Sequence, residues 1–112
     1  MKAEQFLLAA ETIAVIIDDQ AIADAYVTLC VHAGIAAADV ICCAKLGVHY
    51  DGQNHNGAIA LLAKINDATA RDLRTLLDMK TRSGYSAALT SVADQKRAGR
   101  AATALVNAAK LV

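Results

Sequence analysis

The side chains best able to do chemistry are His55, Lys80, Arg82 and Tyr85. His55 stands in a glycine-flanked polar stretch, where backbone N–H donors at a helix start and an imidazole can meet a phosphate. Tyr85 could stack on a base while Lys80 and Arg82 hold its phosphate. The structural alternatives are a capping role for His55 and a tyrosine packed beside two solvated cations. We expect the turns at His55 and Tyr85 to lie together at one polar end of the molecule.

Other candidates have simpler interpretations. Lys45 and His49 straddle a predicted helix end, and a lysine lacks the planar fork of arginine. His32 and Tyr26 stand well apart around one helix, and His32 is expected to be a core histidine. The four acids Asp18, Asp19, Asp24 and Asp39 are expected to be capping or solvated carboxylates, so no metal site and no cofactor are predicted.

The cysteines do not have the spacing of zinc ligands. Cys30, Cys42 and Cys43 fall in an apolar helical pattern, which favours core thiols in a reducing cytoplasm. The longest apolar run, residues 27–38, is too short to span a bilayer, and Glu4 and Glu11 interrupt any signal-peptide pattern. We therefore predict a cytoplasmic protein without a membrane partner.

Composition predicts a single all-α domain over residues 1–112. Fifty-six per cent of the residues are hydrophobic and none is proline, so one helical core can be buried without strands. The formal net charge is zero, which argues against general nucleic-acid affinity, although most of the positive charge lies from Lys64 onward. If a polyanion binds, the second half should hold it.

Apolar periodicity and polar breaks predict five helical segments. They cover residues 3–17, a long second helix over 20–46, a short helix over 56–65, a fourth ending at Met79 or Lys80, and a last one after Ser91. Asn66 and Asp67 supply the break and cap before the fourth helix, and Ser91 with Asp94 forms a capping box for the last. The expected loops run from Gly47 to Asn56 and from Thr81 to Thr90. Four of the segments should form an antiparallel bundle. The small side chains of the long helix should permit close packing, including a homodimer through this helix and its short neighbour.

Several short motifs occur in the order found in the HEPN superfamily. These are Ala25-Tyr26, His32-Ala33, a helix ending at Lys45-Leu46-Gly47, residues 54–57 (Asn-His-Asn-Gly), and residues 76–85 (Leu-Leu-Asp-Met-Lys-Thr-Arg-Ser-Gly-Tyr). Over roughly residues 20–110 the chain resembles that superfamily. The resemblance implies a helical bundle and a role around RNA, often in toxin–antitoxin, phage-defence or stress systems.

The chain departs from the superfamily at the residues that cleave RNA. Catalytic members carry Arg, a spacer of about four to six residues, and then His, whereas here the last histidine is His55 and the first arginine is Arg71. Gly84 also replaces the aspartate that precedes the tyrosine in the family. We therefore expect a noncatalytic module that binds RNA, a nucleotide or a partner protein. The alternatives are a divergent ribonuclease using His55 with Lys80 or Arg82, and a purely structural homodimeric interaction protein.

Overall fold

Five α-helices and no strand make up the described part of the chain. The computed structural model describes residues 1–16, 23–48, 55–85 and 91–112, and for residues 16, 55 and 81–85 the backbone alone. The helices are α1 (Lys2–Ile16), α2 (Ala23–Leu46), α3 (His55–Ala63), α4 (Asp67–Tyr85) and α5 (Val92–Lys110). The predicted all-α bundle is confirmed. Asp18, Asp19 and His49 lie outside the described residues.

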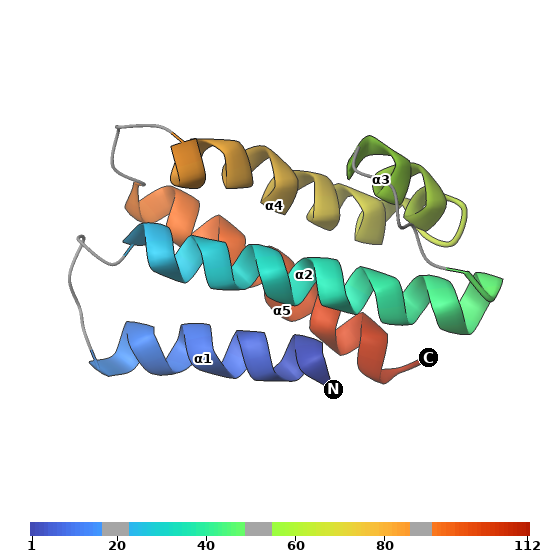
Figure 1. Cartoon of the computed structure of the whole chain (residues 1–112), viewed down its shortest axis with the longest axis horizontal. Helices are drawn as coiled ribbons and strands as arrows, with labels where there is room; N and C mark the ends of the chain where they lie inside the picture. The colour runs from blue at the N-terminus through green and yellow to red at the C-terminus, as the bar shows by residue number, and fades with distance from the viewer. Residues whose placement is uncertain (17–22, 49–54, 86–90) are drawn as a thin grey trace.

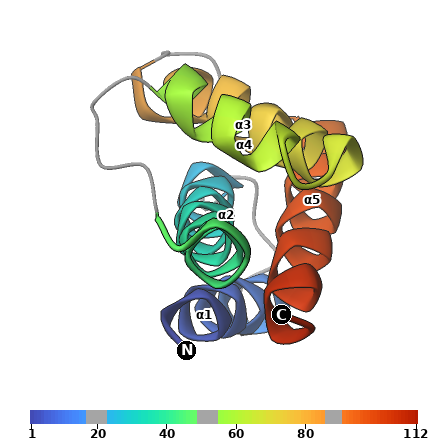
Figure 2. The same cartoon turned by 90° about the vertical axis from the view of Figure 1, so that its right-hand side faces the viewer.

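The long helix α2 is the centre of the bundle. It packs against α1, α4 and α5, while α3 packs mainly against α4. Successive long helices run in opposite directions, and α5 crosses the others at an angle (Figure 1). Seen end-on, α1 lies on one side of α2, α3 and α4 lie on the opposite side, and α5 closes a third side (Figure 2). No described helix covers the side of α2 that faces away from α5.

Polar residues at the predicted breaks end and begin the helices. Gly47 follows α2 with a φ of 74°, a left-handed conformation that favours glycine, and its N–H donates to the Cys43 carbonyl at 3.0 Å. The Asn66 side-chain oxygen accepts from the Thr69 N–H at 3.0 Å before α4. The Ser91 hydroxyl accepts from the Asp94 N–H at 3.0 Å before α5. These three predicted boundaries are confirmed.

The helical stripes predicted for the second half form the core. On α5, the residues from Ala98 to Ala109 that recur at helical spacing are buried. On α4, Leu73, Leu76 and Met79 are at most 2% exposed. Gly34 of α2 lies where these two helices meet. A methyl group added at Gly34 would clash with Leu76 and lie 3.2 Å from the Leu105 Cδ1 atom. A glycine at this point lets three helices approach closely.

The loop predicted from Thr81 is wrong at its beginning. Helix α4 continues through Ser83 and Gly84 to Tyr85. A glycine in a helix costs only about 1 kcal/mol relative to alanine, and the packing of α4 against α2 and α5 outweighs it. Lys80, Arg82 and Tyr85 therefore belong to a helix.

Two predictions for individual core residues are also wrong. His32 is exposed, and its ring stacks on Phe6 with centroids 5.3 Å apart. Cys30 and Cys42 are buried as predicted, but Cys43 is exposed. Both exceptions are exposed positions of α2, and His32 lies at the edge of the contact with α1.

Helix α2 is also long and apolar enough to cross a bilayer by length and composition. Its most apolar window has a mean hydropathy of 1.9, and half of that window is buried inside the bundle. Central helices of water-soluble bundles share these properties, so the observation by itself favours neither environment.

Candidate functional site

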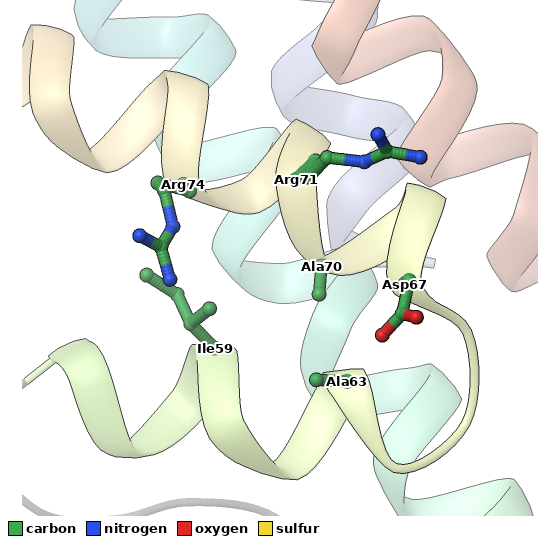
Figure 3. A pocket seen from close by; sticks show the side chains of 6 residues that line it. All are labelled: Ile59, Ala63, Asp67, Ala70, Arg71 and Arg74. Atoms are coloured by element: carbon green, nitrogen blue, oxygen red, sulfur yellow. The ribbon is translucent and has the colours of Figure 1, made fainter.

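A hollow on the described surface lies between α3 and α4. This α3–α4 groove has a volume of about 550 Å³ and is lined by Ile59, Ala63, Asp67, Ala70, Arg71 and Arg74 (Figure 3). Ligand sites in proteins commonly measure about 300–1,000 Å³. The groove is therefore large enough for a nucleotide-sized group.

Apolar side chains form the base of the groove. Ile59 and Ala70 are buried, and Ala63 is exposed at the end of α3. The opposed short side chains, Ala63 on α3 and Ala70 on α4, leave the space between the helices unfilled. A flat apolar group can bury part of its surface there.

Two arginines of α4 supply the positive charge. Arg71 and Arg74 are both exposed, and neither makes an ion pair with another described residue. The Arg74 side chain extends from α4 toward Ile59, across the groove, whereas Arg71 extends away from α3 along the rim (Figure 3). Both guanidinium groups keep their hydrogen-bond donors available for an anion.

One carboxylate limits the positive region at one end. Asp67 is exposed in the first turn of α4, beside the tight turn that joins the helices (Figure 3). An acid at this position interacts favourably with the α4 dipole. The Arg74 end of the groove is therefore the part suited to a phosphate.

Asp72 stands next to Arg71 in the sequence but does not line the groove. Burial raises the pKa of Asp72, and the neighbouring Arg71 charge lowers it by a smaller amount.

His55 and Tyr85 do not share one end of the molecule, and this expectation is wrong. Ile59 faces Ala70 and Arg74 across the groove. His55 stands one turn before Ile59 at the start of α3, so its backbone lies near the level of Arg74 on α4. Tyr85 is the last residue of α4, eleven residues after Arg74, and lies about 16 Å beyond it along that helix, from a rise of about 1.5 Å per residue. Figure 1 shows α3 beside the first part of α4 only.

The structure thus divides the predicted site residues between two regions. The backbone of His55 begins the helix that forms one wall of the groove, in register with the Arg74 part of α4. Lys80 is partly buried on α4, and Arg82 and Tyr85 follow on its last turn. Arg71 and Arg74, which our site prediction omitted, lie nearer to α3. Their spacing of three residues, opposite to the Leu73 and Leu76 stripe, could have indicated an outward basic pair.

A second basic region lies where α4 ends and α5 begins. Leu76 and Leu105 both lie against Gly34, so these antiparallel helices bring Lys80 and Arg82 to the level of the first half of α5. That half carries Lys96, Arg97 and Arg100, all exposed. The Arg97 guanidinium contacts the Asp94 carboxylate at 3.3 Å. This region adds positive potential to the described surface beside α5.

The buried thiol of Cys30 and the partly buried phenol of Tyr26, both on α2, are unsuited to nucleophilic chemistry. Burial raises the pKa of Cys30 to about 11, and burial together with the nearby Cys30 raises that of Tyr26 to about 12. A thiolate is the reactive form of cysteine, and Cys30 remains a neutral thiol at physiological pH. Among the described residues, no cluster of three His, Cys, Asp or Glu side chains could hold a metal ion.

Comparison with known proteins does not assign the chain to a family. No known protein family, no curated protein and no solved structure matches this chain significantly.

Proposed function

We propose that the chain is a noncatalytic module that binds the phosphate of an RNA or a nucleotide in the α3–α4 groove. The observation that carries the proposal is the pair of exposed arginines, Arg71 and Arg74, on the wall of a groove of about 550 Å³ with an apolar base. A guanidinium group binds phosphate through two parallel N–H donors, and its plane can stack on a base.

The chemistry of the groove favours holding a ligand over transforming it. Arginine keeps its proton at physiological pH, so Arg71 and Arg74 can neutralise a phosphate but cannot transfer protons. The order of residues in the chain also lacks the Arg-then-His motif of HEPN ribonucleases. The resemblance to that superfamily supports RNA or a nucleotide as the ligand class, within a cytoplasmic toxin–antitoxin, phage-defence or stress system.

The test is binding of a fluorescein-labelled single-stranded RNA and of ATP, measured by anisotropy and calorimetry over a range of salt concentrations. Replacing Arg71 and Arg74 together by alanine should weaken binding at least tenfold, since a hydrogen bond to a charged group contributes about 1.5–3 kcal/mol. It should also flatten the salt dependence of RNA binding, because fewer counterions are released.

Lys96→Ala with Arg100→Ala is the matched control, because it removes the same charge from α5 outside the groove. Equal losses of binding affinity in the two double variants would show general charge attraction and contradict a site in the groove. Binding of ATP without RNA, or of RNA without ATP, selects the ligand. RNA cleavage that disappears in His55→Ala would replace binding by catalysis as the function.

A further inference from the structure

The α3–α4 groove carries opposite charges at its two ends. Arg74 and Asp67 both belong to α4, and both line the groove. They stand seven residues apart, which is nearly two turns, so they lie on similar sides of the helix and about 10 Å apart along its axis. A ligand that fills the groove lengthwise therefore meets a guanidinium group at one end and a carboxylate at the other.

The carboxylate of Asp67 is available to a ligand. Asn66 already caps α4, because its side-chain oxygen accepts from the Thr69 N–H at 3.0 Å. Asp67 is exposed, and its carboxylate makes no hydrogen bond or ion pair with another residue in the described ranges. An ionised carboxylate has two oxygens that accept hydrogen bonds and no proton to donate. This end of the groove therefore favours a group that carries donors.

The space between the two charges suits a flat group. In Figure 3 the side chains of Ala63 and Ala70 lie between those of Arg74 and Asp67. A nucleic-acid base can bury its faces against such apolar side chains and keep its polar edge for hydrogen bonds. A nucleotide whose phosphate binds Arg74 therefore places its base beside the two alanines and the edge of that base at Asp67.

Guanine is the base whose edge matches a carboxylate. Its Watson–Crick edge presents the N1–H and the 2-amino group side by side, and each of these donors can bond one carboxylate oxygen. Adenine and cytosine present one amino donor beside a ring nitrogen that accepts, and uracil presents one N–H between two carbonyl oxygens. An acceptor that faces a carboxylate loses its hydrogen bond to water and gains none.

We propose that the α3–α4 groove selects guanine nucleotides, with Arg74 holding the phosphate and Asp67 accepting hydrogen bonds from the N1–H and the 2-amino group of the base. Guanine selectivity rests on the proposed function, because it needs the phosphate to bind at Arg74. An adenine nucleotide keeps the phosphate contact and the apolar contacts, so it occupies the same groove more weakly.

Calorimetric titrations with GMP, IMP and AMP test the selectivity. GMP should bind at least tenfold more tightly than AMP, since a bidentate hydrogen-bonded pair discriminates between bases by at least about this factor. IMP has the N1–H but no 2-amino group and should fall between them. Uridine pentanucleotides that carry one central guanosine or adenosine provide the same comparison for single-stranded RNA.

Asp67→Asn tests the role of the carboxylate. The amide offers one acceptor and one donor group, which matches the edge of adenine and no longer that of guanine. The variant should lose at least tenfold in affinity for GMP and keep or gain affinity for AMP. Asp78→Asn is the matched control, because it removes the same charge from an exposed position of α4 outside the groove. It should leave the ratio of GMP to AMP affinity unchanged, and circular dichroism confirms that both variants are folded.

The outcomes separate guanine selectivity from phosphate binding. Equal affinities for GMP and AMP, both lost when Arg71 and Arg74 are replaced by alanine, would overturn the selectivity and leave phosphate binding in place. Equal losses for GMP and AMP in Asp67→Asn would assign the carboxylate to the ribose hydroxyls and also overturn the selectivity. No binding of any of these probes, or binding that the arginines do not affect, would overturn both proposals.

Discussion

The α2–α4–α5 junction and the α3–α4 groove lie on opposite sides of helix α4. At the α2–α4–α5 junction, Leu76 packs with Leu105 against Gly34, and all three residues are buried. In the α3–α4 groove, Arg71 and Arg74 stand in solvent above short side chains. The three junction residues are buried and carry no charge, whereas the groove is open and lined by charged side chains. The fold therefore depends on one side of α4, and the other side is available for a ligand.

The largest effect should come from the junction. Leu76 is fully buried, so Leu76→Ala removes apolar contacts and leaves a cavity among three helices. We expect the free energy of unfolding to fall by about 2–5 kcal/mol. Urea denaturation followed by far-UV circular dichroism measures the change. A loss no greater than that of an exposed-site variant such as Thr103→Ala would contradict the central place of the junction.

The next effect comes from the close approach of the helices at Gly34. Gly34→Val adds side-chain atoms that collide with Leu76 and crowd Leu105. Overpacking of this kind costs about 1–3 kcal/mol, more than the gain of about 0.5 kcal/mol in helix propensity over glycine. Thermal unfolding should show a lower midpoint. An unchanged or higher midpoint would mean that the junction has space to spare.

A smaller effect is expected where α5 begins. Ser91→Ala removes the hydroxyl that accepts the Asp94 N–H at 3.0 Å, and such a cap contributes about 1 kcal/mol. Ser91→Asp retains an acceptor and should preserve most of the stability in the same denaturation experiment. Equal losses in both variants would assign the role to packing rather than to capping.

The smallest effect on stability should come from the groove. Arg71→Ala and Arg74→Ala remove exposed side chains that make no ion pair with another described residue. The free energy of unfolding should therefore change by less than about 0.5 kcal/mol. The same variants carry the proposed loss of ligand binding. A large loss of stability would show that the arginines hold α3 on α4, and the contrast between the two regions would fail.

The predictable parts of the fold were those set by local chemistry. The apolar stripes of α4 and α5 and the caps at Asn66 and Ser91 follow from neighbouring residues in the chain, and the structure confirms them. The end of α4 depends on its packing against distant helices, so Gly84 was misread as part of a loop. The exposure of His32 depends on which side of α2 remains uncovered, which periodicity alone does not reveal.

The candidate site was less predictable because it depends on how two helices face each other. The sequences of α3 and α4 do not reveal that Ala63 and Ala70 lie opposite one another and leave a hollow. Arg71 and Arg74 are visible in the sequence as an outward pair, but only the turn after α3 places them above Ile59. Side-chain size at the contact between helices determined the site, and motif order did not indicate it.

An NMR titration of the isotope-labelled protein with ATP, and separately with a short single-stranded RNA, tests the central claim most directly. If the ligand binds in the α3–α4 groove, backbone amide shifts of residues 59–63 and 67–74 change first and saturate, while those of residues 96–100 follow weakly or not at all. Saturable changes centred on residues 96–100, with the α3–α4 groove unaffected, would contradict it.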